Sequence, residues 1–290
     1  MQAFWHQVLS GLANGGIYAG LALALVIIYR STHHVNFAQG EMAMFSTYMA
    51  WTMIQAGLPY WIAFLAALVL SFALGVLIER IVVRPVEDKP VLVVVIVFVG
   101  LLIIINSIAG WTFGYTPKTF PSPFPEGGWW RGAYLSAHEA GMILVTLAML
   151  ACVFAFFRFT PLGLAMRAAA QNPVSSRLVG IRVGRMLALG WGLAAAVGAV
   201  AGMLAAPIVY LDPNMMAGIL LYGFAGGLMG GIDNPWGAAV GGFLVGVMEN
   251  LAGAYVVGTE LKLSVAFAII IGVLVVKPSG LFGRRLITRV

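Results

Sequence analysis

The residues most able to do chemistry in this sequence are polar side chains set inside long apolar stretches. Two carboxylic acids qualify: Glu41 ends the run Asn-Phe-Ala-Gln-Gly-Glu, and Glu249 lies among apolar residues near the C-terminus. A titratable group at such a position is costly in a membrane and is typical of a substrate pathway or proton relay. Each acid also has a structural interpretation, since Glu41 could lie at the positive end of a helix dipole and Glu249 could hydrogen-bond to a neighbouring helix.

Amide side chains accompany Glu41. Asn14, Asn36, Gln39 and Asn106 fall in or beside the first, second and fourth apolar stretches. A small polar or zwitterionic solute needs hydrogen-bonding groups without strong fixed charge along its path. The sequence therefore predicts that these four amides and Glu41 belong to a translocation path or gate. The alternative is that the same side chains cap helices and join one helix to another.

Signatures of an enzyme are absent from the sequence. It contains no GxxxxGK[ST] phosphate loop, no HExxH zinc motif and no GxSxG nucleophile elbow. The only cysteine, Cys152, excludes an intramolecular disulfide and a cysteine-rich metal site. We therefore predict a chain that is not catalytic by itself and that holds no metal or cofactor of its own.

The composition indicates that these residues are positioned by membrane-spanning helices. The chain is 61% hydrophobic and 9% charged, whereas a typical soluble domain is about 25% charged. A helix needs about 20 apolar residues to cross the hydrocarbon core. Charge-poor runs of that order lie at 8–29, 37–57, 58–78, 90–112, 140–157, 186–211, 217–232, 235–257 and 261–276.

The predicted fold is an all-α membrane protein, a polytopic helical bundle of eight to nine spans in which residues 1–290 form one transmembrane domain. The count stays open because the glycine-rich run 217–232 could be a half-helix or a re-entrant segment. Breaks at 36–40 and 226–237, one in each half, predict broken helices and an inverted repeat, as in many transporters. The glycines of the second break could equally serve close helix packing.

Lysine and arginine predict the orientation, because short loops rich in them stay in the cytoplasm. Clusters at 80–89, 158–185 and 277–289 agree with one another if the chain crosses nine times. The N-terminus and the Pro- and aromatic-rich segment at about 113–139 are then periplasmic, and the C-terminus is cytoplasmic. Trp129 and Trp130 in that segment are expected either to anchor it at the headgroup level or to form a docking surface.

The longest basic segment, 158–185, reads as two short helices. Pro161 precedes a predicted helix at 164–171, and Asn172-Pro173 begins a second helix that ends at Gly180. A basic element between two spans either contacts anionic lipid or inserts into a groove on another protein.

Three motifs together make the sequence resemble the permease subunits of bacterial branched-chain amino acid type ABC importers, over essentially the whole chain. They are NFAQGE at 36–41, RAAAQNPVSSRLVGIRV at 167–183, and GGLMGGIDNPWGAAVGGFLVGVMEN at 226–250. The third motif departs from the usual family pattern around Asp233, so the role of Asp233 stays open.

The resemblance implies a multi-pass permease subunit in the bacterial inner membrane that imports branched-chain or other small amino acids. Its implied partners are a second homologous permease subunit, two cytoplasmic ATPase subunits that hold ATP and Mg, and a periplasmic substrate-binding protein. By the same resemblance, 158–185 is the cytoplasmic coupling loop. Its implied contacts with the ATPase are Arg167, Ala168, Gln171, Arg177, Leu178 and Gly180.

A stand-alone secondary transporter or channel for a small polar solute is the competing function. The coupling loop and the scarcity of acids within the spans argue against it. A scaffold subunit without a pathway of its own is a third possibility, and nucleic acid is excluded as a partner because the basic residues are sparse.

Overall fold

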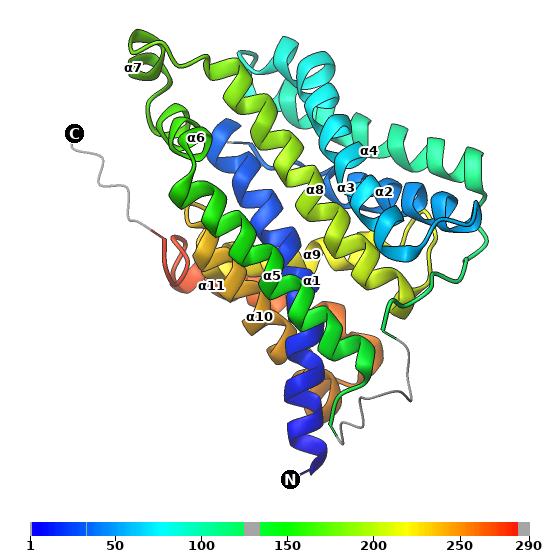
Figure 1. Cartoon of the computed structure of the whole chain (residues 1–290). Helices are drawn as coiled ribbons and strands as arrows, with labels where there is room; N and C mark the ends of the chain where they lie inside the picture. The colour runs from blue at the N-terminus through cyan, green and yellow to red at the C-terminus, as the bar shows by residue number, and fades with distance from the viewer. Residues whose placement is uncertain (1, 33, 125–133, 284–290) are drawn as a thin grey trace.

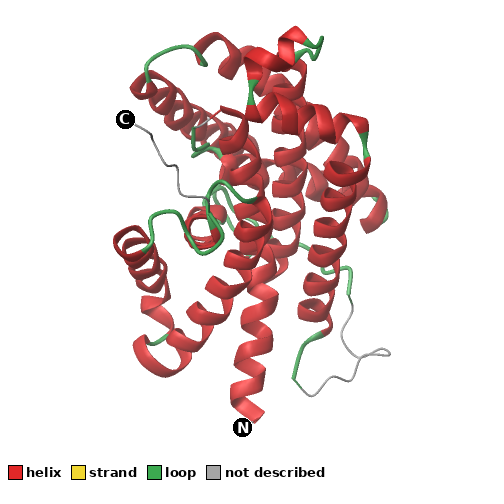
Figure 2. Cartoon of the chain, turned by 90° about the vertical axis from the view of Figure 1, so that its left-hand side faces the viewer, coloured by secondary structure: helices red, strands yellow, loops and turns green. Residues whose placement is uncertain are grey.

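Each long apolar run forms a helix, because within a bilayer the backbone N–H and C=O groups must bond to one another. The structure, a computed structural model, describes residues 2–32, 34–124 and 134–283. Trp129, Trp130 and the arginines at 284, 285 and 289 lie outside the described residues. Within these residues the only strand-like pairing is an isolated bridge between Lys118 and Leu211, so the all-α prediction is confirmed (Figure 2).

The helices follow one another with few long connections (Figure 1). They are α1 (Gln2–Thr32), α2 (Gln39–Gln55), α3 (Tyr60–Ile78), α4 (Val91–Phe113), α5 (Ala137–Phe159), α6 (Pro161–Gln171), α7 (Pro173–Leu178), α8 (Val183–Val209), α9 (Met216–Gly230), α10 (Pro235–Ala252) and α11 (Lys262–Val276). A π-helical turn and then a 3₁₀ turn follow α3, as η1 (Glu79–Val83) and η2 (Arg84–Val86). The same pair follows α10, as η3 (Gly253–Val257) and η4 (Thr259–Leu261).

Seven of the described helical segments are long and apolar enough to cross a membrane. They are α1, α3 with its continuation to Val86, α4, α5, α8, α10 with its continuation to Val257, and Thr259–Val276. The other two predicted runs form shorter helices, α2 with 17 residues and α9 with 15. The chain is therefore a multi-pass membrane protein.

Both short helices begin inside the bundle. The Gln39 side chain at the start of α2 donates to the Ala194 carbonyl near the middle of α8, over 3.0 Å. α9 begins in contact with α2, and it ends where Phe282, after α11, donates to the Gly230 carbonyl. Buried residues in the segments before these helices, including Asn36 and Leu211, hold both helix starts against the bundle. The run 217–232 thus forms a helix that is shorter than the seven candidate spans.

The helix contacts follow an inverted repeat. α1 packs on α9 and α10, and α8 packs in the same way on α2 and α3. Likewise α2 contacts α3 and α4, as α9 contacts α10 and α11. α1 and α8 run in opposite directions, since Arg30 at the end of α1 shares a cavity with Met186 at the start of α8 (Figure 1). The helices α1–α4 and α8–α11 therefore form two related halves, joined by α5–α7.

Glycines allow α1 and α10 to pack backbone against backbone. A Cβ added at Gly246 would lie 2.4 Å from the Gly15 backbone, and one at Gly242 would lie 2.4 Å from the Ala19 backbone. Gly231, with φ of +112°, ends α9 before the turn into α10. The glycine-rich region thus does both things considered for it, since it breaks the helix and also permits close packing.

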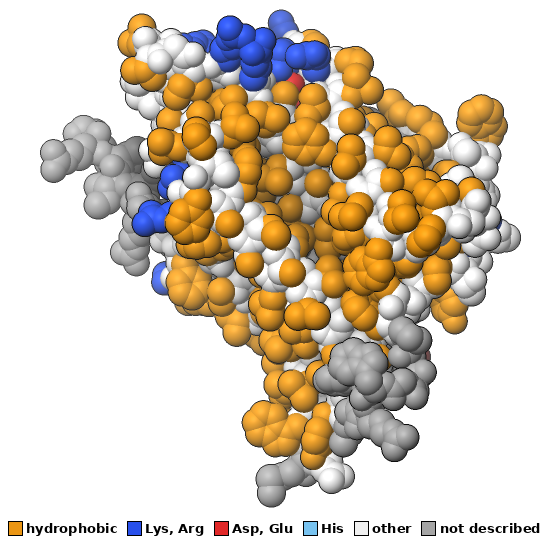
Figure 3. Space-filling model, viewed as in Figure 1, with side chains coloured by type: hydrophobic (Ala, Val, Ile, Leu, Met, Phe, Trp, Pro, Cys, Tyr) orange, Lys and Arg blue, Asp and Glu red, His pale blue; other side chains and the backbone are white. Residues whose placement is uncertain are grey.

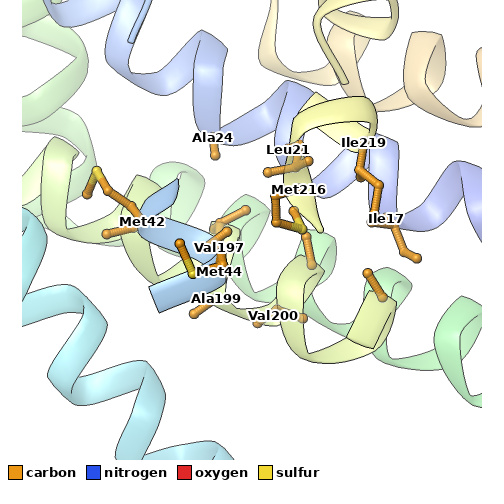
Figure 4. Close-up of a cluster of buried hydrophobic side chains, with 14 of the residues drawn as sticks. Ile17, Leu21, Ala24, Met42, Met44, Val197, Ala199, Val200, Met216 and Ile219 are labelled. Atoms are coloured by element: carbon orange, nitrogen blue, oxygen red, sulfur yellow. The ribbon is translucent and has the colours of Figure 1, made fainter. Parts of the chain in front are cut away.

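The sides of the molecule are mostly apolar, while Lys and Arg side chains gather along the top edge in Figure 3, with a few more at its left side. Exposed apolar residues are abundant on α3, α4 and α11, including Leu65, Ile96 and Ile271. Such a surface suits lipid, and the basic edge lies at one end of the spans. Inside, apolar side chains of α1, α2, α8 and α9 meet in one cluster (Figure 4), including Leu21, Met42, Val197 and Met216.

Candidate functional site

Asn106, on α4, connects the starts of the two short helices. Its amide nitrogen lies 2.8 Å from the Pro213 carbonyl oxygen, 3.2 Å from Asn214 Oδ1 and 3.3 Å from Glu41 Oε2. Glu41 is in the first turn of α2, and Pro213 and Asn214 directly precede α9. The amide has only two protons, so one of the three contacts is shared. We call this group of four residues the Asn106 junction.

Two amide side chains that precede Glu41, Asn36 and Gln39, join the break at 36–40 to α8. Asn36 Oδ1 accepts from the Ala38 N–H over 3.0 Å, which forms the tight turn before α2. Asn36 Nδ2 donates to Gln39 Oε1 over 3.4 Å, and the Gln39 amide then donates to α8 as described above. Both side chains are fully buried. The bond from Gln39 to α8 is a helix-joining bond of the kind that the sequence offered as the alternative to a gate, whereas no side chain among the described residues caps α2.

Asn14 lies apart from this group. It is half-buried on α1, and no hydrogen bond joins it to the other four predicted path residues in the part of the chain that the structure describes. It is one helical turn before Tyr18, which belongs to a second polar group. The structure therefore gathers Asn36, Gln39, Glu41 and Asn106 at the break and places Asn14 elsewhere.

The second polar group surrounds Glu249 on α10. Tyr18 Oη donates to Glu249 Oε2 over 3.3 Å, and Lys262 Nζ lies 3.3 Å from Glu249 Oε1. The ring of Tyr18 also stacks on that of Tyr222, from α9, with centroids 4.8 Å apart. Glu249 is 3% exposed, and its charge is paired with that of Lys262, whose side chain is 26% exposed. The expected bond from Glu249 to a neighbouring helix is confirmed.

Sequence reasoning missed Lys262 as the partner of Glu249. Its amine also donates to Asn250 Oδ1 over 3.0 Å, and the Asn250 amide donates to the Gln7 carbonyl over 2.8 Å. A signal was present, because Lys262 is the only Lys or Arg between positions 186 and 276. A single cation in so long an apolar region indicates a partner acid.

Another buried carboxylate, Glu79, lies at the arginine-rich end. Glu79 accepts three bonds from Arg84, at 3.0 and 3.1 Å to Oε1 and at 2.8 Å to Oε2, and Arg84 Nη2 also donates to the Gly184 carbonyl over 2.7 Å. Arg84 thereby joins the end of α3 to the first turn of α8. Burial and the neighbouring Asp88 raise the pKa of the Glu87 carboxyl, while Arg84 and Arg177 oppose that shift. Glu87, in the segment that follows α3, is thus close enough to Arg177 of α7 for the two charges to interact.

The basic segment between α5 and α8 forms the predicted pair of short helices. Thr160 caps α6 by accepting from the Gly163 N–H over 3.0 Å, and Asn172 caps α7 by accepting from the Ser175 N–H over 2.9 Å. Gly180, with φ of +86°, ends the element. The first helix starts at Pro161, earlier than expected, because proline fits the first helical position after a cap.

The six implied ATPase contacts occupy two environments. Gln171, Arg177, Leu178 and Gly180 are exposed, whereas Arg167 and Ala168 are half-buried between α6 and the spans. Leu178 is 84% exposed and Val179 77% exposed, at the tip of a basic element. Apolar side chains that stand out on a polar end of a protein are typical of an interaction site.

The described residues contain no group of three or more His, Cys, Asp or Glu side chains able to hold a metal ion. The polar groups described above consist of amides, hydroxyls, two ion pairs and the Glu41 carboxylate, which accepts from Asn106.

A family model described as "Branched-chain amino acid transport system / permease component" matches residues 7–274. The high-affinity branched-chain amino acid transport system permease proteins LivH of Salmonella typhimurium and of Escherichia coli are each 34% identical to this chain, over 97% of it and 96% of theirs. BraD of Pseudomonas aeruginosa, described in the same words, is 30% identical with the same coverage.

Proposed function

The chain belongs to the permease family of branched-chain amino acid transport systems, and from that premise we propose that it forms, with a second homologous permease subunit, the import path for branched-chain or other small amino acids. The observation that carries the proposal is the α6–α7 element with its exposed apolar tip, Leu178 and Val179. A permease that works alone has no need of such a tip. An importer driven by a separate ATPase needs a surface through which that ATPase acts.

Two cytoplasmic ATPase subunits are the proposed partners at this tip. They hold ATP and Mg, because the chain itself has no phosphate loop. Arg177 and Gln171 surround the tip with polar groups, and Gly180 provides the turn that returns the chain to the membrane. A periplasmic substrate-binding protein is the proposed partner at the opposite end, where segment 114–124 and the start of α5 lie.

The path from the tip to the interior runs through α8. α7 and α6 both contact α8, and Arg84 holds the first turn of α8 to the end of α3. Farther along, the Ala194 carbonyl of α8 accepts from Gln39 at the break before α2. A displacement of α7 by the ATPase therefore reaches that break through one continuous helix, which is stiff along its axis.

The gate in this proposal is the break itself, comprising Asn36, Gln39, Glu41 and Asn106. The Asn106 junction joins the two halves of the repeat by side-chain hydrogen bonds, which water or a solute can replace when the halves separate. Asn14 belongs to the path at a separate point on α1. Its one-turn separation from Tyr18 places it on the side of α1 that faces α9, near the Glu249 group.

The experiment replaces Leu178 with glutamate. In inside-out vesicles that contain the whole transporter, L178E is expected to reduce both co-purification of the ATPase and ATP-dependent transport at least about tenfold, because a charge is placed in an apolar contact. The control is L281E, which makes the same change at an exposed leucine near the end of α9. If L178E retains the ATPase and full transport, the proposed coupling surface is wrong. Transport by the chain alone in liposomes would favour the stand-alone carrier.

A further inference from the structure

A cavity of about 370 Å³ lies under α6, at the arginine-rich end of the bundle. The ends of α1 and α5, the starts of α8 and α10 and the inner side of α6 form its walls. Three arginines line it, namely Arg30, Arg158 and Arg167. Neither the coupling role nor the transport path described above accounts for this cavity.

Within the described lining of the cavity, Arg158 and Arg167 face no acidic side chain. None of the described residues that line it is Asp or Glu. Arg167 Nε is buried and has no hydrogen-bond partner within the described part of the chain. Burying an unpartnered guanidinium N–H is costly, so the site favours a ligand that accepts hydrogen bonds and carries negative charge.

Apart from Ser31, the rest of the wall is apolar and reaches the outer surface of the bundle at two aromatic side chains. Phe154 is 46% exposed and Trp236 37% exposed, and their ring centroids lie 5.2 Å apart in an edge-to-face contact. Phe157, Met186 and Leu187 continue the apolar surface inward. The ligand is therefore amphipathic, with an anionic group at the arginines and a hydrocarbon part at the aromatic rings.

The depth of the cavity matches a lipid headgroup. Arg30 and Arg158 occupy the last turns of α1 and α5, where these spans leave the apolar region. Basic pockets between spans at this level are suited to anionic lipid headgroups. A zwitterionic amino acid fits less well, because its ammonium group would meet arginines and no carboxylate.

We propose that this cavity binds one anionic phospholipid, whose phosphate lies between Arg158 and Arg167 and whose acyl chain lies along Phe154 and Trp236. The bound phosphate satisfies Arg167 Nε. The lipid then forms part of the support on which α6 rests, since α6 otherwise contacts the spans through α5, α8 and α1. The role of the lipid in supporting α6 during coupling rests on the proposed function. Binding of the lipid itself does not.

Native mass spectrometry of the full chain in detergent tests the proposal. Dioleoyl phosphatidylglycerol is titrated into wild type, R158Q/R167Q and R182Q/R185Q. The third variant loses the same charge at exposed arginines outside the cavity. We expect the affinity for the first lipid to fall about tenfold or more in R158Q/R167Q and to stay near the wild-type value in R182Q/R185Q.

A second variant tests the apolar half of the cavity without changing charge. A Cβ at Gly190 would lie 3.7 Å from Met166 Cε and 4.0 Å from Ser31 Oγ, so its position is not crowded. The ring in G190F then occupies the cavity and is expected to reduce lipid binding while the thermal midpoint stays near that of wild type.

Three results would overturn the proposal. The first is equal binding of phosphatidylglycerol to wild type and R158Q/R167Q. The second is equal binding of dioleoyl phosphatidylcholine and phosphatidylglycerol to wild type, since the net negative charge of the headgroup would then be irrelevant. The third is displacement of the lipid by millimolar glycerol 3-phosphate or inorganic phosphate, which would indicate a site for free phosphate.

Discussion

Replacement of Asn106 by alanine tests whether the two short helices depend on one side chain. The variant removes the contacts to the Pro213 carbonyl at 2.8 Å, to Asn214 at 3.2 Å and to Glu41 at 3.3 Å. Two protons make these contacts, and each hydrogen bond is worth about 0.5–1.5 kcal/mol. In addition, Glu41, which is 6% exposed, loses its amide donor, at a cost of about 1–3 kcal/mol.

The free energy of unfolding of N106A should therefore fall by about 2–6 kcal/mol. Measured as a thermal midpoint in a mild detergent, the fall corresponds to about 3–10 °C for a chain of this size. I104A is the matched control, because Ile104 lies two residues away on α4 and is exposed on the outside of the bundle. Its midpoint should change little.

A double-mutant cycle with E41Q tests whether the stability lost in N106A comes from the Asn106 junction or from a general loss of packing. Glutamine at position 41 carries no charge to desolvate, so N106A should cost less in the E41Q background than in wild type, by about 1 kcal/mol. Two outcomes would refute this reasoning: a wild-type midpoint for N106A, or strictly additive effects of the two changes. Uptake by the assembled transporter should fall in N106A even after correction for protein amount, if the junction is part of the gate.

Three further predictions follow from close packing, from the ion pair of Glu249 with Lys262 and from orientation. G246A should lose about 1–3 kcal/mol of stability because its Cβ would meet the Gly15 backbone at 2.4 Å. The control G272A should not, because a Cβ there has no atom within 4 Å. Equal thermal midpoints for the two variants would contradict the packing argument. K262M leaves Glu249 buried and unpaired and should lower the free energy of unfolding by about 3 kcal/mol or more. Adding E249Q to K262M should restore most of that stability. If K262M is as stable as wild type, the ion pair has no structural role. In a C152A background, a membrane-impermeant thiol reagent added to intact cells should label T116C but not S175C on α7, and the reverse pattern would invert the orientation.

The sequence by itself determined the features that depend on composition and on neighbouring residues. Apolar runs of the right length specify spans because the bilayer has a fixed thickness, and most charged residues lie at the ends of those spans, with Glu249 inside α10 as an exception. Pro161 and Asn172-Pro173 specify where α6 and α7 begin, since caps and proline act over a few residues. The breaks before α2 and at the end of α9 were visible for the same reason.

Only the tertiary structure decided which side of each helix meets another helix. In a soluble protein, a polar side and an apolar side reveal that orientation; in a bilayer, lipid and protein interior are equally apolar, so the sequence pattern does not distinguish them. The contact of Asn106 with Glu41 spans 65 residues and that with Asn214 spans 108. The pairing of Glu249 with Lys262 and the inward placement of Arg167 under α6 depend likewise on how the helices pack. These contacts join residues that only the packing of the helices brings together, and the isolated Lys262 was the one signal in the sequence that pointed to any of them.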